Sequence, residues 1–331
     1  MRPGRFGRYA IRTADGVQEA AYLPIGGIEQ YIRVRGRSRA NPVLLVLHGG
    51  PGSTLGATAC RWQGALEAAF TVVHWDQRGS GNTYYRDPAA PPPTVERRLS
   101  DLDELVYALW ARYGRDRLFL LGHSWGSLLG GLYALRRPEK LSAWLPVSQM
   151  VDFKRSEQVS AAEAIRRARE AGREKDAERL AQELEQVLAL RRLDRAGAGA
   201  LLRFRRRKER YLPPQYGGPS PLGGLAAPEL TGNDLRWKLR FDRMLAANAA
   251  LYEELLGGLS LDGCPPRYGV PVILTAGERD WTTPYPLAAA YYDTLSAPCK
   301  VFLSLPDAGH LPFRERPEEW SHILLDALAQ I

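Results

Sequence analysis

The chain has 331 residues, 45% of them apolar and 25% charged, which suits one large α/β domain with or without an insertion. Its formal net charge is +8, and a dense basic run lies at 203–210, where we expect a solvated helix face or a surface that attracts acidic ligands, since no DNA- or RNA-binding motif accompanies it. No run approaches the roughly 18 apolar residues of a membrane span, so we expect neither a nucleic-acid partner nor a membrane protein.

The first third of the chain alternates between strand and helix patterns. Residues 30–35 alternate as a strand does, and 43–47 form a continuous apolar run, as expected for a strand buried on both faces of a parallel sheet. A helix is predicted over 57–69, a strand over 70–75 and an amphipathic helix over 102–113. This order predicts right-handed βαβ units and an α/β fold with a mostly parallel, doubly wound sheet.

The loop after the run at 43–47 has the sequence HGGPG, at residues 48–52. Glycines at the carboxyl end of a strand leave backbone N–H groups unhindered and directed into the crevice. We predict that the N–H of Gly50 supplies one half of an oxyanion hole and the N–H of Trp125 the other. The alternative is a plain tight turn.

The pattern that points most specifically to a catalytic residue lies at 118–127. An apolar strand ends at Gly122, a small-residue helical pattern follows, and Ser124 lies on the sharp turn between them. Such a turn projects the serine hydroxyl beside a helix N-terminus, and glycines two residues to either side prevent clashes with neighbouring elements. The pattern predicts that Ser124 is a nucleophile, and the alternative is an ordinary strand–helix turn.

After a strand predicted over 143–147, the pattern changes. Residues 151–256 are typical of helices and contain no convincing strand. We predict a helical cap insertion that covers the crevice, with core segments at 1–150 and 257–331. An independent second domain is the alternative, but strand patterns resume after the insertion.

The last segment returns to alternating elements. Strands are predicted over 270–275 and 300–305, and helices over 284–295 and 317–330. Each of the two strands is followed by a short loop, and these loops contain the remaining candidate catalytic residues.

A nucleophilic serine needs a base within hydrogen-bond reach and an acid that orients that base. Of the five histidines, only His310 follows a strand end in a way that suits the base. His48 lies in the glycine loop and His74 in a predicted strand. His123 lies beside the serine, where we expect its side chain to point away, and His322 lies in the terminal helix. For the acid, Asp280 is favoured over Asp307, which suits a turn.

The three cysteines are widely spaced and odd in number: Cys60, Cys264 and Cys299. They indicate neither a disulfide framework nor a zinc site, which fits a reducing compartment. There is no metal-ligand cluster and no Walker-type loop, and the basic N-terminus lacks the apolar core of a signal peptide. We therefore expect a cytoplasmic protein with no metal and no cofactor. The oligomeric state is not predicted.

The motifs HGGPG, WDQRGSGNT and GHSWGS together resemble the prolyl iminopeptidase group of serine aminopeptidases, within the α/β-hydrolase fold. The resemblance implies that Ser124, Asp280 and His310 form a catalytic triad under a helical cap. In that family, glutamates of the cap bind the free amino group of the substrate. This chain departs from the family there, because the cap motif ENHYF is missing and the comparable residues 240–244 read RFDRM.

These patterns predict a serine hydrolase that acts through an acyl-enzyme, which water activated by His310 then cleaves. The leading prediction is an aminopeptidase that releases an N-terminal residue from short peptides, and the alternative is a carboxylic-ester hydrolase acting on a small acyl substrate. A catalytically silent receptor is disfavoured by the intact triad. The acids available to bind an amino group are Glu157, Asp242, Glu253 and Glu254, and the sequence does not choose among them.

Overall fold

Eight strands form one sheet, in the order β1-β2-β4-β3-β5-β6-β7-β8. The computed structural model describes residues 9–216, 227, 229–262 and 266–331. Strand β2 pairs antiparallel with both β1 and β4, and every pairing from β4 to β8 is parallel. The strands are β1 Val17–Ile25, β2 Ile28–Gly36, β3 Val43–Leu47, β4 Thr71–Asp76, β5 Leu118–His123, β6 Leu141–Val147, β7 Val272–Gly277 and β8 Lys300–Leu305. The predicted mostly parallel α/β sheet is confirmed.

Strand β3 shows why the apolar runs become central strands. All five of its residues are buried, and alternate residues point to opposite faces of a sheet. Leu44 and Val46 join the core on one face, whereas Leu45 and Leu47 join the core on the other. A strand covered on both sides needs apolar residues at every position, which explains the continuous run.

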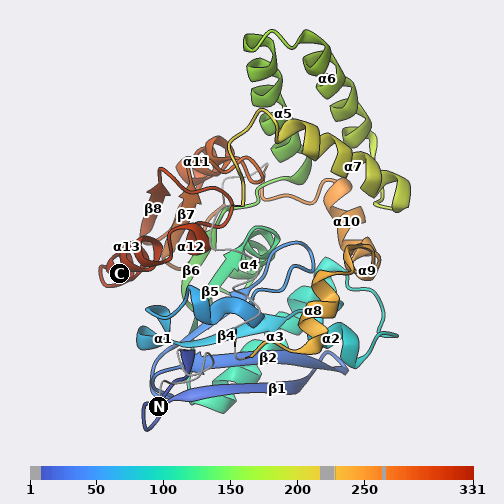
Figure 1. The fold of residues 1–331 in the computed structure, drawn as a ribbon. Helices are drawn as coiled ribbons and strands as arrows, with labels where there is room; N and C mark the ends of the chain where they lie inside the picture. The colour runs from blue at the N-terminus through green and yellow to red at the C-terminus, as the bar shows by residue number, and fades with distance from the viewer. Residues whose placement is uncertain (1–8, 217–226, 228, 263–265) are drawn as a thin grey trace, which may run out of the picture.

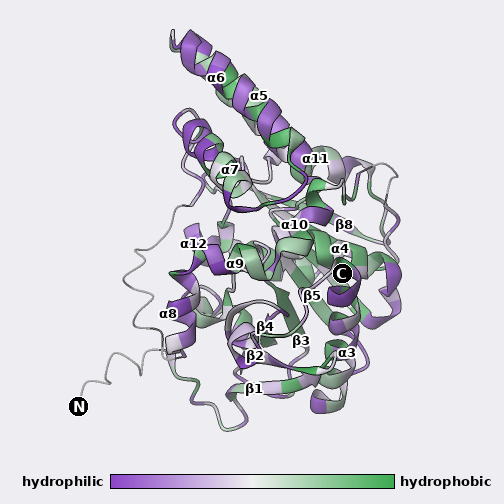
Figure 2. Ribbon diagram, turned by 90° about the vertical axis from the view of Figure 1, so that its right-hand side faces the viewer, coloured by the Kyte–Doolittle hydropathy of each residue, from purple (hydrophilic) through white to green (hydrophobic). Residues whose placement is uncertain are grey.

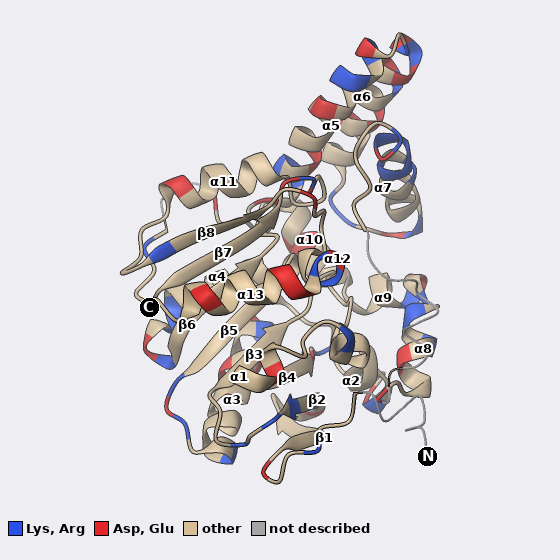
Figure 3. Cartoon of the chain, turned by 60° about the vertical axis from the view of Figure 1, so that its left-hand side comes forward, with Lys and Arg blue, Asp and Glu red and all other residues tan. Residues whose placement is uncertain are grey.

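Helices cover both faces of the sheet (Figure 1). The core on one face includes residues of α3, α4 and α11, and the core on the other includes residues of α1, α12 and α13. Figure 3 shows α11 and α13 on opposite sides of β7 and β8. The bounds are α1 Leu66–Ala69, α2 Gly81–Arg86, α3 Val95–Tyr113, α4 Trp125–Arg136, α11 Tyr285–Thr294, α12 Pro312–Glu315 and α13 Pro317–Leu328, with 3₁₀ helices η2 Gly56–Arg61 and η3 Pro138–Lys140.

Two features of the first third differ from the sequence prediction. The helix expected over 57–69 is divided into η2 and α1, with Gly64, a weak helix former, in the interruption. Strand β1 was not predicted at all. It contains Pro24 and has a mixed burial pattern, and it lies at the edge of the sheet, where a proline is tolerated.

The described part of the segment between β6 and β7 contains helices joined by loops and contributes no strand to the sheet. We call residues 151–256 the cap. Figure 1 shows α5, α6 and α7 standing above one end of the sheet, and in Figure 2 the outer end of this group is strongly hydrophilic. The cap helices are α5 Phe153–Glu170, α6 Glu174–Ala189, α7 Arg195–Lys208, α8 Gly232–Lys238, α9 Phe241–Ala247 and α10 Ala249–Leu256. In the part of the chain that the structure describes, no helix is long and apolar enough to cross a membrane.

Candidate active site

Ser124 lies on a sharp turn between β5 and α4. Its φ is 55° and its ψ is −121°, a conformation that residues other than glycine rarely adopt and that is maintained only by the surrounding structure. The turn places Ser124 at the N-terminus of α4 and at the carboxyl end of the parallel sheet, where open α/β sheets bind their ligands.

The glycines around Ser124 leave no room for side chains. A Cβ on Gly122 would lie 2.3 Å from the carbonyl oxygen of Gly126, and a Cβ on Gly126 would lie 2.3 Å from that of Leu47. Both distances are far below contact distance. The strand, the turn and α4 can therefore pack this closely only because these two positions lack side chains.

Three predicted residues form one chain of hydrogen bonds. His310 Nδ1 donates to Asp280 Oδ2 at 2.9 Å, and His310 Nε2 lies 3.1 Å from Ser124 Oγ. All three residues are buried. Because the carboxylate holds the proton on Nδ1, Nε2 has a lone pair available to accept the proton of the Ser124 hydroxyl.

The carboxylate of Asp280 is buried and fully hydrogen-bonded. Its Oδ1 accepts from the backbone N–H groups of Thr282 and Thr283 at 2.9 and 3.0 Å, and its Oδ2 accepts from the Thr283 hydroxyl at 2.9 Å. Burial raises the pKa of Asp280, but the attraction of His310 and these hydrogen bonds outweigh it and leave the pKa below its ordinary value. Asp280 therefore stays ionised beside the imidazole.

Asp307, the other candidate acid, does not contact His310 in the described contacts. Its carboxylate is half exposed and pairs with Arg279 and with Arg316. It shares no hydrogen bond with His310 among the described contacts, whereas Asp280 contacts His310 directly.

The expectation that the His123 side chain points away from the site is wrong. Its ring lies 4.8 Å from the His310 ring, between centroids, and its Nε2 donates to the His310 carbonyl oxygen at 2.9 Å. The Ser148 hydroxyl donates to the same oxygen at 3.1 Å. His123 thus helps to fix the main chain of His310, and burial lowers the pKa of His123 to about 3, which keeps the ring neutral.

The glycine loop lies against Ser124. Gly49 and Gly50 line the same cavity as Ser124, and the loop is closed by a hydrogen bond from the Ser53 N–H to the Gly49 carbonyl at 3.0 Å. Gly50 has a φ of 114°, which requires glycine. Trp125 is the first residue of α4, and its side chain is buried.

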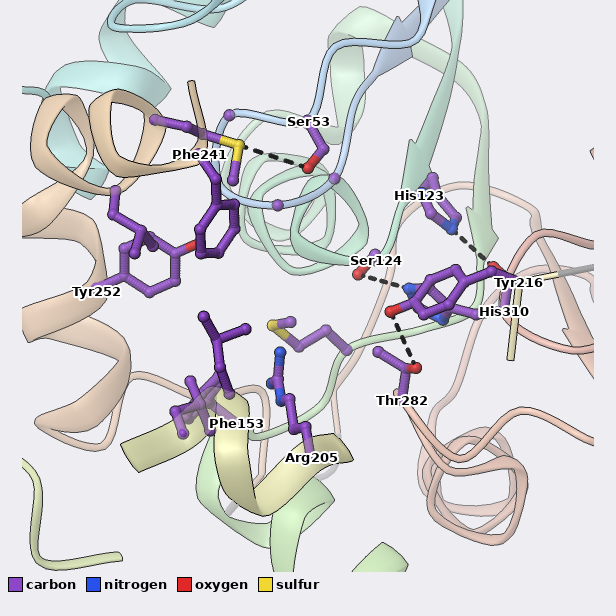
Figure 4. A pocket seen from close by; sticks show the side chains of 18 of the residues that line it. Ser53, His123, Ser124, Phe153, Arg205, Tyr216, Phe241, Tyr252, Thr282 and His310 are labelled. Atoms are coloured by element: carbon purple, nitrogen blue, oxygen red, sulfur yellow. Dashed lines mark hydrogen bonds between the residues drawn. The ribbon is translucent and has the colours of Figure 1, made fainter. Parts of the chain in front are cut away.

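A cavity of about 450 Å³ opens above Ser124 and His310, between the sheet and the cap (Figure 4). Most of the cap side chains that line it are apolar or aromatic. They include Phe153, Leu193, Ala198, Leu201, Leu202, Tyr216, Trp237, Phe241, Met244, Leu245 and Tyr252. Its charged lining residues are Glu157, Arg205, Lys238 and Arg314. The cavity is thus a mainly apolar chamber with a few polar groups near the serine, as is typical of sites for small ligands.

Of the four predicted substrate-binding acids, Glu157 lines the cavity. It is buried on α5 and is already paired, because Arg205 Nε donates to its Oε1 at 2.7 Å and Lys208 Nζ to its Oε2 at 2.6 Å. Burial raises the pKa of Glu157, but these two cations outweigh it and lower the pKa to about 2.

The other three acids lie outside the cavity lining. Asp242 is exposed and pairs with Arg240. Glu254 accepts a hydrogen bond at 2.9 Å from the backbone N–H of Val95, at the start of α3. Glu253 is exposed. The structure therefore does not bring these three together with Ser124.

Apart from Glu157, the cap residues that contact this site were not predicted from the sequence. Gln215 accepts a hydrogen bond at 2.9 Å from the His310 N–H through its carbonyl oxygen, and Tyr216 stacks edge-on against the His310 ring at 5.8 Å between centroids. Arg205 was seen only as part of a basic run, which Figure 3 shows along α7. No local pattern distinguished these residues. Within the described residues there is no cluster of three or more metal-ligand side chains.

Comparison with known proteins agrees with this fold. The family model described as the alpha/beta hydrolase fold matches residues 42–317. The chain belongs to the α/β-hydrolase fold family. This α/β-hydrolase is also 27% identical to a protein named probable aminopeptidase YbaC from Bacillus subtilis, over 91% of this chain and 93% of that one.

The proline iminopeptidases resemble part of this α/β-hydrolase more closely in sequence. The enzyme from Lactobacillus delbrueckii subsp. lactis is 34% identical over 113 residues, which span 34% of this chain and 37% of that relative. The crystal structure of the proline iminopeptidase from Mycobacterium smegmatis superposes with a TM-score of 0.61 at 21% identity, covering 94% of this chain and 98% of that one. At that identity the likeness supports the fold alone. This hydrolase therefore has aminopeptidase-named relatives at modest identity.

Proposed function

We propose that this hydrolase is a serine hydrolase that acts through an acyl-enzyme on Ser124. The observation that carries the proposal is the continuous hydrogen-bond chain from Ser124 through His310 to Asp280. His310 removes the hydroxyl proton as Ser124 attacks the carbonyl carbon, and the same proton then passes to the leaving group. A water molecule activated by His310 cleaves the acyl-enzyme in the second half of the reaction.

The developing oxyanion needs donors beside Ser124. We assign these to the backbone N–H groups of Gly50 and Trp125, which belong to the glycine loop and to the start of α4. The N-terminus of α4 adds a favourable partial positive charge. Within this proposal the cap at 151–256 is a roof that excludes water from the chamber.

The proposed substrate is a short peptide from which the enzyme releases the N-terminal residue. The names of its relatives support this choice. The substrate's ammonium group would then lie near an acid, and Glu157 is the candidate on the cavity wall.

A carboxylic ester is the second candidate, and one observation favours it. Glu157 already pairs with Arg205 and Lys208, so a substrate ammonium group would be a third cation on one carboxylate. An ester without an amino group avoids that repulsion.

Two experiments test the proposal. A fluorophosphonate should label the protein covalently at Ser124, and Ser124→Ala should lose labelling and turnover, with a loss in kcat on the order of 10⁶-fold. Full activity of this variant would overturn the mechanism.

The substrate class is tested with free and N-acetylated aminoacyl-arylamides beside short-chain aryl esters. If the enzyme is an aminopeptidase, acetylation should lower kcat/KM by about 10²-fold or more. Glu157→Gln should then raise KM for free amines but not for esters, whereas Glu163→Gln, a change of the same kind on the same helix outside the cavity lining, should do neither. Equal turnover of blocked and free amines would favour the ester.

A further inference from the structure

The cavity wall contains more positive than negative charge beside Ser124. One carboxylate, that of Glu157, is paired with two cations, Arg205 and Lys208. Their side chains are largely removed from solvent. Lys208 Nζ lies 2.6 Å from Oε2 and also donates to the Ser160 hydroxyl at 2.6 Å. The three side chains together carry one surplus positive charge, and Arg205 is the cation of this cluster that lines the cavity.

Arg205 is held with part of its hydrogen-bonding capacity unused. Its Nε and Nη2 both donate to Glu157 Oε1, and no hydrogen bond of Nη1 is found among the described contacts. The side chain is 32% exposed and lines the cavity. Figure 4 shows it beside Phe153, on the side of Ser124 away from His310, and its guanidinium lies 5.5 Å from the Phe153 ring centroid.

Apart from Glu157 and Lys208, the groups near Arg205 are mainly apolar or aromatic, and they include Tyr216 and Tyr252. Phe153, Leu201 and Leu202 belong to the same wall. A cation in such a setting is poorly solvated and interacts strongly with an anion that enters. Because Glu157 fixes the guanidinium plane, a ligand loses little free energy in ordering the side chain.

We propose that the acyl group of the substrate carries a carboxylate and that Arg205 Nη1 binds it. This inference rests on the proposed function, since it places the acyl group against the cap and the leaving group at His310, which protonates it. The surplus of one positive charge in the Glu157–Arg205–Lys208 cluster favours a substrate that places a carboxylate beside Arg205. The substrate class is thus either a peptide with an N-terminal acidic residue or a monoester of a dicarboxylic acid.

Two further cations line the cavity, and the proposal does not assign the carboxylate to them. Lys238 is exposed. Arg314 Nη2 already donates to the Thr58 hydroxyl, although at 3.4 Å. Both contribute to a positive potential that attracts an anionic substrate, but neither is fixed by a buried carboxylate as Arg205 is.

The test compares acidic substrates with neutral analogues of the same chain length. The pairs are α-glutamyl and glutaminyl 4-nitroanilide, and the monoaryl ester of adipic acid and the aryl ester of hexanoic acid. In at least one pair, kcat/KM should be about 10²-fold higher for the acidic member, since a buried ion pair is lost with the neutral one. Arg205→Gln should abolish this preference, so that the ratio of kcat/KM between the acidic and the neutral member falls to about one, because the guanidinium that binds the carboxylate is lost.

Arg206→Gln is the matched control, since Arg206 is the exposed neighbour on α7, and it should keep the preference. Equal kcat/KM for the members of both pairs would overturn the proposal, and so would a preference that survives Arg205→Gln but disappears in Arg314→Gln. Calorimetric binding of adipate to the Ser124→Ala and Ser124→Ala/Arg205→Gln variants needs no turnover. A loss of binding in the double variant supports the carboxylate site even if the acyl-enzyme mechanism fails, and equal binding contradicts it.

Discussion

The carbonyl oxygen of Gln215 accepts a hydrogen bond from the backbone N–H of His310 at 2.9 Å. The Gln215 side chain strengthens this connection, because its Nε2 donates to the Arg279 carbonyl at 2.9 Å and its Oε1 accepts from the Trp281 N–H. One residue of the cap thus binds the loop of His310 and the loop of Asp280 together. The cap contributes to the position of the base as well as to the walls of the cavity.

Gln215→Ala should therefore impair the reaction more than the fold. The backbone bond to His310 survives, but the two side-chain bonds to the loop of Asp280 are lost, so the loops of Asp280 and His310 are less firmly fixed. We expect kcat to fall by up to about 10²-fold, the scale of an ångström-sized misplacement, with little change in far-UV circular dichroism. Gln158→Ala, at an exposed cap position, is the control, and equal kcat values for the two variants would contradict this role.

A comparison of Asp280→Asn with Asp307→Asn should show which of the two aspartates orients His310. An amide in this position can donate to His310 Nδ1, which moves the imidazole proton to Nε2 and prevents that atom from accepting the serine proton. We expect kcat to fall by about 10⁴-fold while the fold persists. Asp307→Asn should change kcat far less, because Asp307 pairs with surface arginines. The reverse order would mean that the acid is misassigned.

Ser124→Gly should make the protein more stable as it becomes inactive. The φ of 55° at this position is unfavourable for any residue with a Cβ, and glycine adopts it readily. Urea unfolding should show that Ser124→Gly exceeds Ser124→Ala in stability by about 1 kcal/mol. Both variants lack the hydroxyl, so the comparison isolates the backbone. A glycine variant that is less stable than the alanine variant would show that the turn is not strained.

The buried histidines should make stability depend on pH. Burial lowers the pKa of each of His48, His74 and His123 from an ordinary 6.5 to about 3. Between these values the unfolded chain binds protons that the folded chain does not. The folded state is therefore most favoured above pH 6.5 and loses stability as the pH falls, by up to about 1.4 kcal/mol per pH unit for each histidine.

His74→Gln tests this dependence away from the cavity lining. Its imidazole contacts the Gln63 side chain at 2.6 Å. The free energy of unfolding, measured between pH 7.5 and 5, should fall less steeply for this variant, by about one histidine's share. His322→Gln, at an exposed position on α13, should keep the wild-type slope. Identical slopes for all three proteins would mean that folding does not change the pKa of His74.

The sequence by itself determined the features that depend on neighbouring residues. The continuous apolar run of β3, the glycines on either side of Ser124 and the loop at 48–52 each express a local requirement of burial or backbone space. Such requirements can be predicted from the order of residues in the sequence. The parallel sheet follows from the alternation of strands and helices, because parallel strands need crossover connections.

The tertiary structure decided what lies together across long separations. Glu157 meets Arg205 and Lys208 from 48 and 51 residues away, so its ion pairs could not be read from α5 alone. The ring of His123 packs beside His310, although its neighbours in sequence indicate only a strand end. Side-chain direction and ion pairing depend on which helices and strands pack together. The turn at Ser124 can be predicted from its neighbours in sequence, but the charged residues that line the cavity beside it are brought together only by the whole fold.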